Sequence, residues 1–132
     1  MNVKFYVPFQ TAQALKEKGY PQSDAEFYYS MFDSSVLGYI HERTKLESLY
    51  NEKFSIMLEC LVAAPTYHEV VDWLEEKGIT IEVKKHYITN NDDYGWKSYI
   101  QRSEYDREFV KFVMTTREEA INAAIIKALE KL

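Results

Sequence analysis

The sequence predicts an α+β fold in which an antiparallel sheet is flanked by three helices. Two segments with helical spacing of apolar residues enclose a run of short segments in which apolar and polar residues alternate. The helical segment at residues 66–77 opens with a Thr-x-x-Glu capping box at Thr66 and Glu69. The helical segment at residues 116–132 opens with the same motif at Thr116 and Glu119. Short turns join antiparallel neighbours, so residues 79–114 are predicted to form a three-stranded meander.

The three helices are predicted at residues 8–18, 66–77 and 116–132. Pro8 suits the first position of a helix because the missing N–H of proline has no partner there. Gly78 follows the second helix and is placed to adopt the left-handed conformation that ends a helix. The apolar faces of the second and third helices are predicted to be Tyr67, Val70, Val71 and Leu74, and Ile121, Ala124, Ile125, Ala128, Leu129 and Leu132.

The predicted strands are residues 2–7, 26–32, 79–83, 94–102 and 108–114. The middle of the chain is less distinct. Residues 36–40 fit a strand, and residues 54–62 fit either a helix or a strand, because short apolar runs do not separate the two. The sequence contains no repeat, linker or low-complexity tract, so residues 1–132 are predicted to form a single domain.

Composition limits the possible functions. The chain has 132 residues and no apolar run of the roughly 18 residues that a membrane-spanning helix needs. The first ten residues lack the apolar core of a secretory signal, and Cys60 is the only cysteine, so we expect a cytoplasmic protein. A net charge of −5 argues against an anionic membrane or nucleic acid as the partner, although a local basic patch remains compatible with it.

The sequence assigns no catalytic or metal-binding residue. His68 and Asp72 have the spacing of a helical metal site, but the motif lacks its second histidine, so a surface hydrogen bond is expected. Cys60 lies in an apolar run and is predicted to be buried and unreactive. Since no glycine-rich loop suited to phosphate is present either, we expect no cofactor and a protein that is not an enzyme.

The predicted order over residues 66–132, a helix, three antiparallel strands and a helix, is also the order of a double-stranded RNA-binding domain. Such domains contact phosphates with basic side chains at the start of the second helix. Here that start reads TTREEA, in which Glu118 and Glu119 would repel phosphate. We therefore expect the shape without the affinity for duplex RNA.

Aromatic residues are frequent, and three of them, Tyr28, Tyr29 and Tyr99, form the candidate interaction surface. Phe27, Tyr28 and Tyr29 are consecutive, so an extended chain sends rings to both faces of its sheet. Tyr99 alternates out of phase with Ile100 and is expected to point away from the core. Uncovered rings would suit a protein partner or a second copy of the chain. The alternative is that helices cover both faces and the rings belong to a core.

Four stretches together suggest a relationship: VPFQTAQALKEKGY near the start, APTYHEVVDWLEEKGITIEV, YGWKSYI, and TREEAINAAIIKALEKL at the end. In these the chain resembles a family of small uncharacterised proteins of Bacteroides-type gut bacteria, their prophages and other mobile elements. The resemblance covers both ends and the second half but not residues 21–63. It implies a bacterial, cytoplasmic protein of phage or other mobile-element origin, and gives no residue a role.

The sequence thus favours a non-enzymatic interaction or accessory protein of mobile-element or phage origin. Its partner would be another protein or a second copy of the chain. Two alternatives stay open, a small enzyme with a site in residues 21–63 and a nucleic-acid-associated regulator. A pocket with convergent ionisable groups would favour the enzyme, and a contiguous basic face would favour the regulator.

Overall fold

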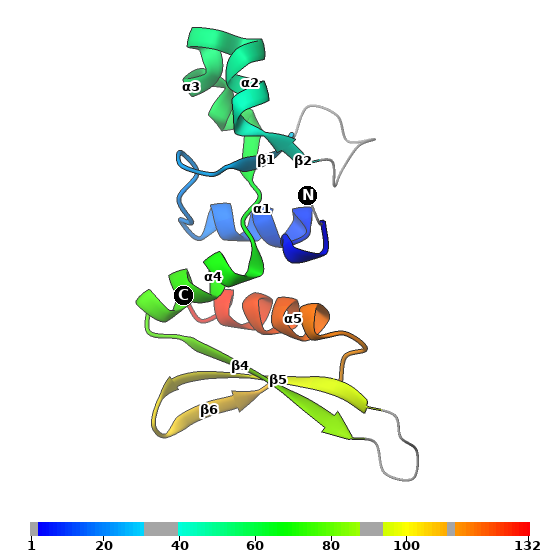
Figure 1. Ribbon diagram of the computed structural model, residues 1–132. Coiled ribbons are helices and arrows are strands. Elements are labelled where there is room, and N and C mark those ends of the chain that lie inside the picture. The colour runs from blue at the N-terminus through cyan, green and yellow to red at the C-terminus, as the bar shows by residue number, and fades with distance from the viewer. Residues whose placement is uncertain (1–2, 31–39, 88–93, 111–112) are drawn as a thin grey trace. The chain divides into compact units, whose positions relative to one another are not determined.

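The computed structural model describes residues 3–30, 40–87, 94–110 and 113–132. The fold is α+β, as predicted, with two three-stranded antiparallel sheets and helices packed on them (Figure 1). The chain divides into two compact units, Met1–Thr66 (unit 1) and Tyr67–Leu132 (unit 2). Whether the two act as the single domain expected from the sequence stays a prediction.

Unit 1 begins with a short 3₁₀ helix, η1 (Val3–Phe5), and helix α1 (Phe9–Glu17). The helix predicted at 8–18 is therefore present, with Pro8 as its N-cap in an extended conformation. The strand predicted at 2–7 is wrong. Val3–Phe5 form the 3₁₀ helix, and the strand-like pairing of the segment is limited, within the described residues, to an isolated bridge between Tyr6 and Thr66.

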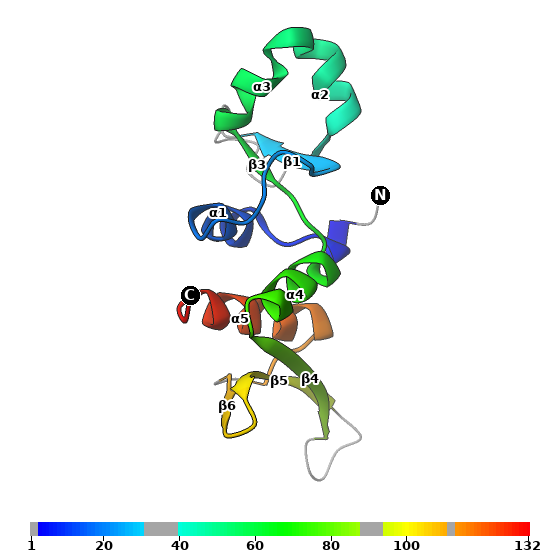
Figure 2. The ribbon, with the colours of Figure 1, turned by 90° about the vertical axis from the view of Figure 1, so that its left-hand side faces the viewer.

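The sheet of unit 1 has the order β2–β1–β3, with β1 (Phe27–Ser30) antiparallel to both β2 (Ile40–Glu42) and β3 (Leu61–Ala63). Helix α1 lies on one side of this sheet, and α2 (Arg43–Tyr50) and α3 (Phe54–Met57) lie on the other (Figures 1 and 2).

Residues 54–62, for which helix and strand were equally compatible, contain both. Helix α3 is followed by a 3₁₀ turn, Leu58–Cys60, and then by β3. The strand expected at 36–40 is described only from Ile40 onward, and its other residues lie outside the described part of the chain.

Unit 2 consists of α4 (Tyr67–Glu76), β4 (Thr80–Tyr87), β5 (Tyr94–Ser103), β6 (Asp106–Phe109) and α5 (Arg117–Leu129). The predicted meander is confirmed, since β4 pairs with β5 and β5 with β6, both antiparallel. Both helices lie on the same side of the sheet (Figure 2). No helix in the described ranges is long and apolar enough to cross a membrane.

The ends of the elements in unit 2 differ from prediction. The third strand, expected at 108–114, ends at Phe109, and Met114 makes only an isolated bridge to Trp96. Residues 111 and 112 lie outside the described part. The core also takes in Trp73, which the predicted stripe of α4 omitted, whereas Leu132 lies beyond the end of α5 and is exposed.

The N-cap of α5 supports a first prediction. The Thr116 hydroxyl accepts a hydrogen bond of 3.1 Å from the backbone N–H of Glu119, as the capping box predicted. Thr116→Ala removes that acceptor from a first-turn amide and should lower the free energy of unfolding by about 1 kcal/mol. Urea denaturation measures the change, and Thr115→Ala, an exposed neighbour outside the helix, is the matched control. Equal midpoints for the two variants would contradict the capping role.

Candidate functional site

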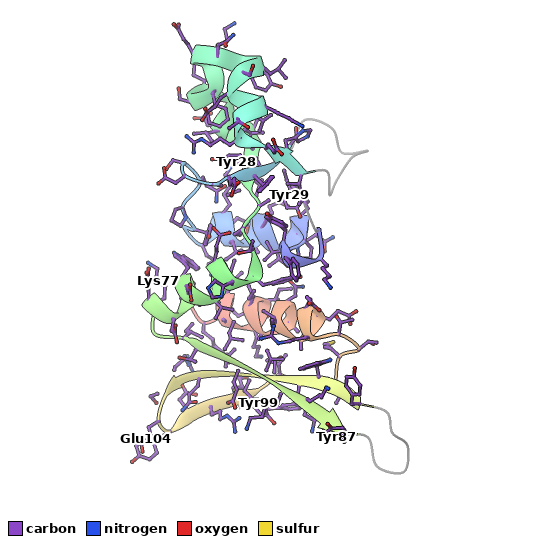
Figure 3. All side chains as sticks on the ribbon, in the orientation of Figure 1. Tyr28, Tyr29, Lys77, Tyr87, Tyr99 and Glu104 are labelled. Atoms are coloured by element: carbon purple, nitrogen blue, oxygen red, sulfur yellow. The ribbon has the colours of Figure 1, made fainter. Side chains whose placement is uncertain are left out.

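Tyr28 and Tyr29 lie in the core of unit 1, on opposite faces of β1 (Figure 3). The Tyr28 ring is fully buried, packs edge-on against Phe54, and donates its hydroxyl hydrogen to the Gln22 carbonyl at 2.6 Å. Burial raises the pKa of Tyr28 above its ordinary value. Tyr29 packs against Phe9 on the other face and donates to the Val7 carbonyl at 2.6 Å.

The expectation that these two rings are exposed is therefore wrong. Alternation along β1 sends them to opposite faces, as expected, but helices cover both faces of this sheet. Tyr28 and Tyr29 therefore belong to a core, which was the alternative expectation, and neither ring is available to a partner.

The core position of Tyr28 can be tested against an exposed tyrosine. Tyr28→Ser should cost about 3–5 kcal/mol of folding stability, because it removes a buried ring and a buried hydrogen bond. Tyr105→Ser is the matched control, since that ring is 93% exposed and its loss should change stability by about 0.5 kcal/mol or less. Chemical denaturation of both variants measures the difference. A small effect of Tyr28→Ser would show that the ring is not part of the core.

Tyr99 lies on the face of the unit 2 sheet that points away from α4 and α5 (Figure 3). Its neighbours Ser98 and Ile100 are buried, so alternation along β5 sends Tyr99 to the opposite side. The strand register places further side chains beside it. We call this surface the open face, and its residues are Thr80, Glu82, Lys84, His86, Lys97, Tyr99, Gln101, Arg107 and Phe109.

Two aromatic rings stand together on the open face, each with a cation over it. Tyr99 and Phe109 are a cross-strand pair with ring centroids 5.4 Å apart. The Arg107 guanidinium lies 3.9 Å from the Tyr99 ring centroid, and the Lys97 ammonium lies 5.4 Å from that of Phe109. Phe109 remains 44% exposed. The surface thus combines apolar ring area with positive charge.

The open face is basic although the whole chain is acidic. Lys84 stands directly opposite Lys97 in the strand register, and like charges in such a pair destabilise a sheet. Among the residues of the open face, Glu82 is the only acid. Its carboxylate lies 2.7 Å from Arg107 and 3.1 Å from Lys84, so it neutralises part of the charge and leaves Lys97 without a carboxylate on this face.

These ion pairs give a pH prediction. Hydrogen bonds from Lys84 and then Arg107 hold the pKa of the Glu82 carboxyl below its ordinary value. The pairs therefore stabilise the fold above the unfolded-state pKa of a glutamate, and that contribution disappears as the pH falls through the lower folded-state value. Unfolding of the wild type and Glu82→Gln at several acidic pH values measures it. The two should converge at the lowest pH, and a constant difference would show that the pairs are not formed.

A second aromatic cluster, which the sequence did not predict, lies at the far end of the β4–β5 hairpin. By register it belongs to the other face of the sheet, where Lys85 stands opposite Trp96 and Tyr87 opposite Tyr94. The Lys85 ammonium lies 4.3 Å from the Tyr94 ring centroid and 5.8 Å from that of Trp96. Alternation over both strands could have revealed the cluster, had the pairing register been known.

Unit 1 contains a shallow depression around α2 and α3, within the segment proposed for an enzyme site. Its lining includes Glu47, Tyr50, Lys53 and Phe54. Glu47 is already bound to Arg43 in the same helix. The depression therefore presents solvated groups rather than a set of ionisable side chains converging on one point.

The remaining candidates for chemistry are dispersed. His68 and Asp72 are 3.4 Å apart on the exposed side of α4, which is the surface contact expected. Cys60, expected to be buried, is a free thiol that is partly exposed because it lies in the 3₁₀ turn before β3. Within the described ranges, no three His, Cys, Asp or Glu side chains are placed to hold a metal ion together.

Comparisons with models of known protein families, with curated proteins and with solved structures found no match to this chain. The resemblance drawn from sequence stretches thus stays a prediction. The candidate site is accordingly defined by geometry and charge alone. It is the open face of unit 2, to which Tyr99 belongs and Tyr28 and Tyr29 do not.

Proposed function

We propose that this chain is a non-enzymatic binding protein whose unit 2 presents its open face to a negatively charged partner. The observation that carries the proposal is the pairing of two neighbouring rings with cations, the half-buried Tyr99 with Arg107 and the exposed Phe109 with Lys97. Aromatic and arginine side chains are the residues that contribute most to binding energy at interfaces. Here both kinds lie together on one sheet face.

The Glu82 ion pairs on this surface contribute to the stability of unit 2, but its core does not account for the surface. The core of the unit forms on the other side of the sheet, where Ile100 is buried beneath the helices. On the open face, the Lys84–Lys97 pair opposes folding rather than assisting it. A negatively charged partner would relieve that repulsion, and binding would then offset the cost of keeping the two lysines opposite each other.

The sign of the charge selects the partner. The whole chain has a net charge of −5, so a second copy would meet the open face mainly through its own acidic surfaces or not at all. A separate polyanionic partner gains from every cation of the face at once. This makes self-association the weaker form of the proposal. The cytoplasmic location and the accessory, mobile-element origin expected from the sequence are carried as part of it.

A face-specific capture experiment tests the proposal. Immobilised wild type and Lys97→Glu are exposed to a lysate of the source organism, with Lys45→Glu as the matched control. Lys45 is exposed on α2 and is not one of the open-face residues, so its reversal changes the net charge equally. A component retained by the wild type and Lys45→Glu but lost from Lys97→Glu is expected.

Identical retention by all three proteins would contradict the proposal, as would retention by none. Treating each capture with nuclease shows whether the component is a nucleic acid or a protein. Thermal unfolding of the two variants shows that the loss does not come from misfolding.

A further inference from the structure

We propose that the open face binds single-stranded nucleic acid, with Tyr99 and Phe109 stacking on bases and Lys84, Lys97 and Arg107 contacting phosphates. This inference rests on the proposed function and names its ligand class. It departs from the expectation that net charge alone suggested, because charge is not evenly distributed over the chain.

The rings have the placement that base stacking needs. Tyr99 and Phe109 come from neighbouring strands, so they stand side by side on a rigid sheet rather than on a loop. Phe109 is 44% exposed, and its ring is accessible to a base. The Arg107 guanidinium covers the Tyr99 ring at 3.9 Å, so a base stacks on Tyr99 when Arg107 turns from the ring to a phosphate. Stacking of this kind tolerates any base, so little sequence preference is expected.

The cations complete the site. Lys84 and Lys97 are direct cross-strand neighbours, whose Cβ atoms are about 5 Å apart in such pairs. A phosphate between their ammonium groups would replace repulsion with two ion pairs. Lys97 also reaches the Phe109 ring, so the phosphate contact and the stacking contact are adjacent. A polyanion that carries planar rings matches both features, whereas an acidic peptide matches the cations alone.

The same geometry disfavours a duplex. Paired bases are stacked on one another and offer no free ring face to Tyr99 or Phe109. The start of α5, which a double-stranded RNA-binding domain would use, carries Glu118 and Glu119. Single-stranded and duplex ligands therefore separate the proposed mode from general attraction to phosphate.

Glu82 provides a test in the opposite direction. Its carboxylate pairs with Arg107 and Lys84, and so competes with phosphate for two of the three cations. Glu82→Gln should tighten binding of a single strand, whereas misfolding would weaken it. The matched control is Glu75→Gln, which makes the same change of net charge on the exposed side of α4.

The experiment is fluorescence anisotropy of the full chain with labelled oligo-dT and oligo-U of about 15 nucleotides, the upper part of the usual site size. Salt-sensitive binding of both is expected. Lys97→Glu should weaken it and lower the salt slope by about one or more, while Lys45→Glu should change it little. Phe109→Leu, which keeps the charge and an apolar side chain, should weaken binding at least about fivefold. Glu82→Gln should strengthen it relative to Glu75→Gln.

Each of the following outcomes decides against the inference. Equal affinity for a duplex of the same length, or for poly-glutamate, would reduce the face to a general polyanion site. Undiminished binding by Phe109→Leu would remove the stacking role. Absence of oligonucleotide binding together with a nuclease-resistant, Lys97-dependent capture would overturn this inference and leave the proposed function standing. Absence of both would overturn the two together.

Discussion

The packing of α4 and α5 against one face of the β4–β5–β6 sheet governs the rest of unit 2. Because side chains alternate along a strand, burying Ile100 under the helices sends Tyr99 to the other side. The register then places Lys97 and Phe109 beside it. The burial of Ile100 on the covered face therefore determines which side chains lie on the open face. A shift of register by one residue would exchange the two sets of side chains.

The sheet of unit 1 is covered differently, so its tyrosine rings are less accessible than that of Tyr99. Its sheet has helices on both sides, and Tyr28 and Tyr29 each bury a ring and bind a backbone carbonyl with the hydroxyl. A tyrosine in such a place contributes to specificity of packing, because its hydroxyl must find a partner when water is removed. The two kinds of sheet explain why Tyr28 and Tyr29 are buried whereas Tyr99 is only half-buried.

The open face contains both attractive and repulsive pairs of charges. Glu82 holds Arg107 and Lys84, while Lys84 and Lys97 repel each other across the strands. The face is thus partly neutralised without a ligand. A phosphate must displace or share the Glu82 contacts, which would keep binding weaker than the number of cations suggests. Such a surface suits reversible association better than permanent assembly.

Signals between residues that are close in the sequence determined much of the secondary structure of unit 2. The period of apolar residues, the capping residue Thr116 and the glycine at 78 placed the second and third helices within a few residues, because these features act between neighbours along the chain. The meander followed from the short turns between strands. Tyr99 was likewise placed outward by alternation alone.

Tertiary structure decided what depends on distant residues. Whether the rings at 28 and 29 are exposed depends on helices that are remote in sequence, so alternation placed them on opposite faces but could not reveal that both faces are covered. The segment before Pro8 forms a 3₁₀ helix at Val3–Phe5 and an isolated bridge between Tyr6 and Thr66, a residue distant in the sequence. The basic aromatic face arises only when the register of β4, β5 and β6 brings residues from three strands together, and no pattern within one strand contains that information.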